Sequence, residues 1–143
     1  MNNFILRFTR NSIFFIWLFL FISMNMKTTG EGQDEWINLT DENQLNEIIV
    51  ESRSKPVIIY KHSTRCGLST VAYQRLQNGL DKLTPQASLY YLDLIQYREV
   101  SAKVSEIFGV RHQSPQVLII KNGAAAYMAS HHEIVVNDIL QYL

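Results

Sequence analysis

Two patterns of apolar residues alternate along the chain from Trp36 onward. Continuous apolar runs rich in β-branched and aromatic side chains predict strands covered on both faces, whereas apolar positions spaced by three or four residues predict helices. The predicted strands cover residues 36–39, 57–60, 89–92, 117–120 and 124–128. The predicted helices start after Thr40 or Asp41 and cover residues 66 to about 83, about 98 to 108, and 132–143.

Turn and cap residues separate these elements. Pro56 ends any helix before the second strand, and Gly109 stands where a helix end needs a left-handed residue. Asn122 and Gly123, placed between two apolar runs, predict a hairpin. The order strand, helix, strand, helix, strand, helix, hairpin, helix therefore predicts an α/β fold, in which a mixed sheet carries helices on both faces.

The N-terminal region follows a different pattern. Residues 13–22 are all apolar, with Arg7 and Arg10 before them and Lys27 after them. The run is shorter than the ~20 residues of a membrane span but fits the ~7 to 15 of a signal-peptide core. A secretion signal, a signal anchor and a start codon assigned too early remain open, and the last two are favoured. The chain thus divides into a hydrophobic segment at 1–27, a linker at 28–35 and one domain at 36–143.

Charge adds little to this picture. The sequence has 13 basic and 13 acidic residues, so its formal net charge is zero. No run of like charge forms a tail, and no basic patch is evident, which disfavours nucleic-acid binding.

The chain has a single cysteine, Cys66, between a predicted strand and a predicted helix. One cysteine cannot form an internal disulfide, so any disulfide must be intermolecular, and a Cys-rich zinc site is excluded. An unpaired reactive thiol fits a reducing compartment, and we therefore expect a cytoplasmic protein. Membrane anchoring through residues 13–22 is the alternative.

The residues around Cys66 favour thiol chemistry. A helix that begins there would direct its positive end at the sulfur, and Lys61, His62 and Arg65 would add positive charge, so that the thiolate is favoured. Many lone cysteines are instead small buried hydrophobes. The polar and glycine-containing surroundings favour an exposed cysteine.

The order of elements, with a thiol at the start of the helix after the second strand and Ser114–Pro115 before the hairpin, resembles the thioredoxin fold. The resemblance implies that Pro115 is preceded by a cis peptide bond and faces Cys66. An ordinary trans proline that opens an edge strand is the alternative.

A more specific resemblance is carried by residues 61–66 (KHSTRC) and 112–117 (HQSPQV), and it covers nearly all of residues 36–143. These segments resemble the bacillithiol-system redox-active family of YtxJ type, the monothiol bacilliredoxins. The resemblance implies reversible exchange with the low-molecular-weight thiol bacillithiol in the cytoplasm. No bound cofactor is expected, since bacillithiol would act as a co-substrate, and the partners would be S-thiolated proteins.

One position departs from that pattern. Typical members have proline after the cysteine, where this chain has Gly67. The resulting Cys-Gly-Leu-Ser resembles the Cys-Gly-Phe-Ser signature of monothiol glutaredoxins, which use glutathione and carry iron–sulfur clusters. Their late Gly-Gly-Asp segment is missing, because residues 130–133 (SHHE) stand there instead. A glutathione-dependent or cluster-binding protein therefore stays the alternative, and glutathione is disfavoured.

The mechanism expected from these residues is thiol–disulfide exchange with Cys66 as nucleophile. The side chains and backbone expected to stabilise its thiolate or to bind the thiol substrate come from both motifs: Lys61, His62, Arg65, Gly67, Ser69, Ser114 and Pro115. Arg98 could pair with a bacillithiol carboxylate or lie exposed. The adjacent His131 and His132 point in different directions, and no further ligand is close in the sequence, so no metal site is expected.

Overall fold

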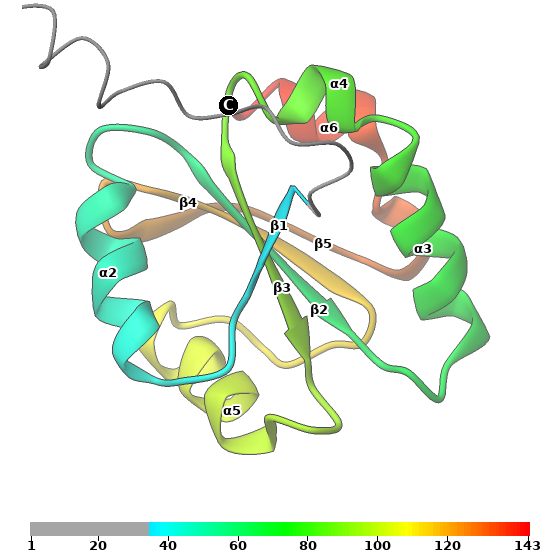
Figure 1. The fold of residues 1–143 in the computed structure, drawn as a ribbon, viewed down its shortest axis with the longest axis horizontal. Coiled ribbons are helices and arrows are strands. Elements are labelled where there is room, and N and C mark those ends of the chain that lie inside the picture. Colours follow the sequence, from blue (N-terminus) through cyan, green and yellow to red (C-terminus); the bar gives the residue numbers. More distant parts are fainter. Residues whose placement is uncertain (1–34) are drawn as a thin grey trace, which may run out of the picture. The chain divides into compact units, whose positions relative to one another are not determined.

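The computed structural model describes residues 35–143, which form a five-stranded mixed sheet with the strand order β1-β3-β2-β4-β5 (Figure 1). The strands are β1 (Trp36–Asn38), β2 (Val57–His62), β3 (Ser88–Asp93), β4 (Gln116–Lys121) and β5 (Ala124–Ser130). The helices are α2 (Asn43–Glu51), α3 (Gly67–Gln77), α4 (Leu80–Leu83), α5 (Arg98–Ile107), the 3-10 helix η1 (His131–Glu133) and α6 (Val136–Leu140). The predictions for residues 1–34 lie outside the described part.

The sheet is parallel on one side and antiparallel on the other. β3 pairs in parallel with both β1 and β2, whereas β4 pairs antiparallel with β2 and with β5. The predicted hairpin is confirmed, because Asn122 and Gly123 have φ values of 51° and 78°. Gly109, with φ 63°, has the predicted left-handed conformation after α5. The α/β fold with a mixed sheet and helices on both faces is also confirmed.

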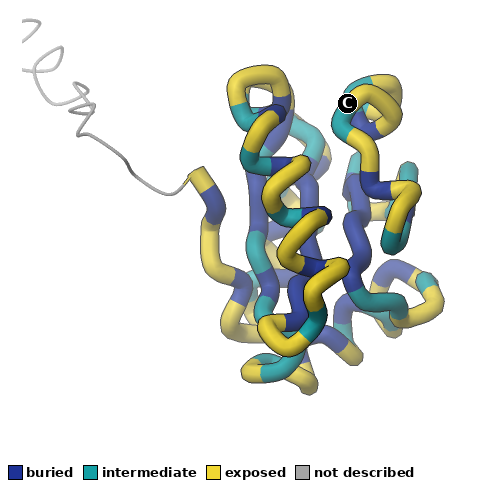
Figure 2. Tube along the Cα trace, turned by 90° about the vertical axis from the view of Figure 1, so that its right-hand side faces the viewer, coloured by how far each residue is buried: buried dark blue, intermediate teal, exposed yellow. Residues whose placement is uncertain are grey.

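Two hydrophobic cores lie on opposite faces of the sheet. Alternation along β2 directs Ile58 and Tyr60 into the core covered by α3, α4 and α6, and Val57 and Ile59 into the core covered by α2 and α5. Figure 2 shows the buried residues concentrated in the strands between the helices. Every residue of β2 is buried, so this central strand packs into both cores. The loop that follows its carboxyl end is therefore attached to a strand that is packed on both faces.

Two predicted helices differ from those observed. The helix expected over 66–83 is divided into α3 and α4 at Gly79, where a Cβ would lie 2.7 Å from two methyl carbons of Val136. The last helix, expected over 132–143, is only a 3-10 turn followed by α6. Ile134 and Val135 lie between them in extended conformations, since the Ile134 side chain is fully buried in the core next to α3. None of the helices in residues 35–143 is long and apolar enough to cross a membrane.

Candidate active site around Cys66

Cys66 lies at the carboxyl end of β2 and is the N-cap residue of α3. Its backbone is extended, with φ −120° and ψ 117°, and its side chain is half-buried. The Cys66 amide donates to the Ser63 carbonyl at 3.1 Å, and the Thr70 amide donates to the Cys66 carbonyl at 3.3 Å. The Cys66 side chain makes no capping hydrogen bond to α3, but it stands at the N-terminal end of the helix, where the helix dipole favours negative charge.

Ser69, three residues after Cys66 in α3, holds the loop that carries Cys66. The Ser63 amide donates to the Ser69 hydroxyl oxygen at 3.2 Å, and the Tyr60 hydroxyl donates to the Ser69 carbonyl at 2.7 Å. Both Tyr60 and Ser69 are fully buried. Ser69 was expected to contact the thiol, but its hydroxyl is directed to the loop backbone, so its observed role is to position Cys66.

The outer side of the same helix end is open. A Cβ placed on Gly67 would meet no atom within 4 Å, and Arg65 is exposed. Leu68 and Val71, on the first turn and a half of α3, are 45% and 44% exposed. Two half-exposed apolar side chains therefore follow Cys66 within five residues of the sequence.

Lys61 does not lie on the Cys66 side of the sheet. Alternation along β2 directs it to the α5 face, where its ammonium group donates to the Ser101 carbonyl and the Ser105 hydroxyl, both at 3.3 Å, and lies 2.9 Å from His112 Nδ1. It is completely buried, and this burial lowers the pKa of Lys61 from its usual 10.5 to about 8. The expected direct role of Lys61 beside the thiolate is therefore corrected.

His62 faces the same side as α3, but in an aromatic environment. Its ring centre lies 5.9 Å from those of Tyr60 and Tyr73 and 5.4 Å from that of Tyr91. Burial lowers the pKa of His62, with a smaller opposing effect from Asp93, so the ring is neutral at pH 7. It therefore does not supply the positive charge expected of it.

The loop before β4 approaches the same end of β2. Lys61 pairs with Gln116 in the antiparallel register, which puts Pro115 level with His62. The Ser114–Pro115 peptide bond is cis, as the thioredoxin resemblance implied. The Pro115 carbonyl accepts a hydrogen bond from the His131 amide at 3.2 Å, and η1 packs against α3. The buried hydroxyl of Ser114 has no hydrogen-bond partner within residues 35–143.

A partly exposed cysteine at a helix start and a cis-proline loop that reaches the carboxyl end of the same central strand are features that the sequence resemblances imply. The family model of the monothiol bacilliredoxin BrxC matches residues 37–139. The chain belongs to the monothiol bacilliredoxin family. Its one cysteine agrees with the monothiol character of this family.

Solved structures with a thioredoxin fold resemble this bacilliredoxin-family chain. A candidate oxidoreductase with a thioredoxin fold is 30% identical to it, with a TM-score of 0.66, over 74% of this chain and 91% of that one. The reduced thioredoxin pre-protein of Schistosoma mansoni is 20% identical, with a TM-score of 0.62, over 77% and 100%. The thioredoxin of Fasciola hepatica is 17% identical, with a TM-score of 0.58, over 73% and 92%. The fold is thioredoxin-like, and the protein is a redox oxidoreductase.

Metal binding has no support from the side chains near the bacilliredoxin motif. His131 has a left-handed backbone with φ 54°, and its neighbour His132 is exposed. Within residues 35–143 no three His, Cys, Asp or Glu side chains come close enough to hold a metal ion.

Three residues near the site were not predicted from the sequence: Tyr60, Leu68 and Val71. The only signal for any of them was the apolar character of Leu68 beside the cysteine.

Proposed function

We propose that the protein removes bacillithiol from protein mixed disulfides through Cys66, in the cytoplasm. The observation that carries this proposal is the position of Cys66 as the half-buried N-cap of the 11-residue helix α3, with open space around Gly67. A sulfur at this position is favoured as a thiolate by the helix and remains accessible to a second sulfur. The family to which the chain belongs supports bacillithiol as the co-substrate.

The exchange proceeds in two displacements. The Cys66 thiolate attacks the bacillithiol sulfur of a mixed disulfide, the original S–S bond breaks, and the substrate protein leaves as a thiolate that takes up a proton. A second bacillithiol then attacks the capped Cys66, which regenerates the thiolate and releases bacillithiol disulfide. The second bacillithiol supplies the electron pair and the proton that the substrate sulfur gains, while the first bacillithiol sulfur stays in a disulfide throughout.

The residues around Cys66 have separate roles in this reaction. Exposed Arg65 is the cation nearest to Cys66 in sequence, and Lys61 and His62 are excluded from this role by burial. The Ser69 contacts hold the loop before the cysteine in one conformation. The edge of the cis-proline loop at Ser114 and Pro115 presents backbone to the incoming disulfide, as such loops do in the fold that the chain shares.

The test is transfer of the thiol adduct, followed by mass spectrometry. The full chain is mixed with a protein substrate carrying either bacillithiol or glutathione as a mixed disulfide. We expect one bacillithiol adduct on Cys66, none on the Cys66→Ser variant and little transfer from the glutathione substrate. Transfer from the glutathione substrate alone would move the protein to the glutaredoxin class, and no adduct from either would end the exchange mechanism.

Two arginines at opposite ends of α3, one in the loop before it and one in its last turn, provide a matched pair to test the effect of positive charge. Arg65 precedes Cys66, whereas Arg75 lies in the last turn of the same helix, and both are exposed. We expect Arg65→Gln to slow adduct transfer about two- to fivefold, since an exposed charge contributes ~0.2 to 1 kcal/mol. Arg75→Gln removes the same charge at the far end and should leave the rate unchanged. Equal rates for both variants would show that Arg65 has no such role.

A further inference from the structure

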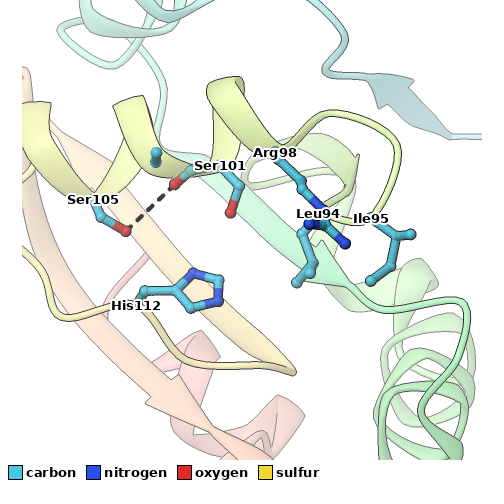
Figure 3. Close-up of a pocket in the computed structure, with 7 residues that line it drawn as sticks. Leu94, Ile95, Arg98, Ser101, Ser105 and His112 are labelled. Atoms are coloured by element: carbon cyan, nitrogen blue, oxygen red, sulfur yellow. Dashed lines mark hydrogen bonds between the residues drawn. The ribbon is translucent and has the colours of Figure 1, made fainter.

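A cavity of about 540 Å³ lies on the α5 side of the sheet, at the edge where β3 ends. The turn after β3, the first two turns of α5 and the loop before β4 line it: Leu94, Ile95, Arg98, Ser101, Ala102, Ser105 and His112. Figure 3 shows the Arg98 guanidinium beside Leu94 and Ile95, with the ring of His112 on the opposite side. Cys66 is not among the lining residues, so the cavity is separate from the sulfur.

Positive charge at this cavity is not neutralised by the protein. Lys61 lies beneath it, and the ammonium group bonds only to neutral groups of the lining residues Ser101, Ser105 and His112. No carboxylate within residues 35–143 comes within ion-pair distance of Lys61 or Arg98; the ion pair on α5 joins Lys103 and Glu106. A buried charge without a counter-ion is costly, and a bound anion would relieve that cost.

A donor inside the cavity also lacks a partner. The Ser101 side chain is 3% exposed, and its hydroxyl makes no hydrogen bond within the described residues. Figure 3 shows this hydroxyl directed into the space between His112 and Arg98, away from the Ser101 carbonyl that accepts from Ser105. Buried hydroxyls are normally hydrogen-bonded, so the Ser101 hydroxyl, directed toward the cavity, is free to bond a ligand atom there.

We propose that this cavity binds the carboxylate of a small organic molecule, held by Arg98 and the Ser101 hydroxyl above the buried charge of Lys61. The planar fork of a guanidinium matches a carboxylate. The apolar side chains of Leu94, Ile95 and Ala102 provide a surface for the organic part of the ligand, which a bare inorganic anion would not use. The site goes beyond the proposed exchange reaction and does not depend on it.

Amide NMR titration of the full chain carrying Cys66→Ser tests the proposal without any thiol chemistry. Succinate is the probe carboxylate, and inorganic phosphate is added in parallel at equal ionic strength. We expect saturable shifts for succinate at residues 94–105 and at His112, and weaker binding of phosphate. Shifts that do not saturate, or equal binding of the two anions, would overturn the proposal.

Substitutions locate the site and keep the test specific. Arg98→Gln should weaken succinate binding about tenfold, as expected for a charge-assisted hydrogen bond. Ser101→Ala should weaken it about threefold, in line with a neutral one. Lys103→Gln removes a charge from the same helix, but one that is paired with Glu106, and should leave binding unchanged. Equal effects of Arg98→Gln and Lys103→Gln would reduce the site to general electrostatic attraction and contradict the proposal.

A competition experiment identifies the source of the carboxylate. Bacillithiol added to the succinate-saturated Cys66→Ser chain displaces succinate if the co-substrate's own carboxylates occupy the cavity. Retention of succinate assigns the cavity to a separate carboxylate. Because Cys66 is absent from this experiment, failure of the exchange reaction and failure of this site give different results.

Discussion

The hydroxyl of Tyr60 donates a 2.7 Å hydrogen bond to the carbonyl of Ser69, one turn into the helix that Cys66 caps. This contact joins the central strand β2 to α3 directly beneath the cysteine. Burial is the main cause that raises the pKa of Tyr60, so the hydroxyl keeps its proton and remains a donor at any pH at which the protein works.

Tyr60→Phe should therefore weaken the support of the active-site loop. The ring would keep its stacking on Tyr73, while the buried Ser69 carbonyl would lose a donor. We expect the free energy of unfolding, measured in urea, to fall by about 1 to 2 kcal/mol. Tyr142→Phe, at a 43% exposed position, is the matched control and should change it little. An unchanged free energy of unfolding in Tyr60→Phe would show that the Ser69 carbonyl does not need the Tyr60 hydroxyl as a donor.

The sequence predicted the parts of the site that depend on chain order. Cys66 after a buried strand, the Asn122–Gly123 turn and the cis-proline candidate Pro115 each follow from local residue types or from the family pattern, and each is found where expected. The elements alternate as the apolar pattern predicts, because strand and helix periods are properties of short segments. The fold class could therefore be read from the sequence.

The direction in which each side chain points could not be read in the same way. Lys61, His62 and Arg65 are neighbours of the cysteine in sequence, yet one is buried on the far face, one lies among aromatic rings and one is exposed. Strand alternation predicts opposite faces for Lys61 and His62, but only the packed helices show which face belongs to Cys66. The close approach of Val136 to Gly79, 57 positions earlier in the chain, could likewise not be read from the sequence.

The burial of Lys61 has a direct consequence for stability. The lowered pKa, about 8 instead of 10.5, corresponds to a cost of about 3 kcal/mol for the charged form. Lys61→Met should therefore raise the free energy of unfolding at pH 7 by about 1 to 3 kcal/mol, because an apolar side chain of similar length needs no counter-charge. Lys103→Met, at a part-exposed position on α5, serves as the control and should have no such effect.

The pH dependence of unfolding gives a second measure of the same group. Between pH 8 and 10.5 the unfolded chain keeps the Lys61 proton longer than the folded chain does, so stability should rise with pH. The range from pH 7 to about 9.5 is the useful one, since tyrosines ionise above it. Lys61→Met should lose this rise, whereas burial, followed by the charge of Lys61, lowers the pKa of His112, which also faces this cavity, from its usual 6.5 and so away from this range. A rise that persists in the variant would contradict the assignment to Lys61.

The lowered pKa of His62 predicts how the free energy of unfolding changes on the acid side of pH 7. Its pKa is lowered below 6.5, chiefly by burial, so below about pH 6.5 the unfolded chain binds a proton that the folded chain binds less readily. Stability should therefore fall as the solution is acidified from pH 7 to 5. His62→Phe keeps an aromatic ring among Tyr60, Tyr73 and Tyr91 and should make this fall less steep, while the contribution of His112, whose pKa burial also lowers, remains. His132→Phe, at an exposed position, should leave the acid limb as it is.

Gly67 allows the departure from the family pattern to be tested. Proline is well suited to the first position of a helix, and the residue before it must be extended, as Cys66 is with φ −120° and ψ 117°. A Cβ at Gly67 meets no atom within 4 Å, so the proline ring begins in open space. Gly67→Pro should raise the free energy of unfolding by about 0.4 to 1 kcal/mol, because it restricts the unfolded chain.

The same variant separates two sources of thiolate stabilisation. Proline removes the N–H of Gly67 but leaves those of Leu68 and Ser69, which are the first-turn donors that an N-cap side chain normally engages. The rate of Cys66 alkylation at pH 7 should therefore stay within about twofold of the original. Gly67→Ala keeps every N–H and serves as the control. A large loss of alkylation rate in Gly67→Pro, with Gly67→Ala unchanged, would show that the backbone N–H of residue 67 itself holds the thiolate, a donor that a proline at this position cannot supply.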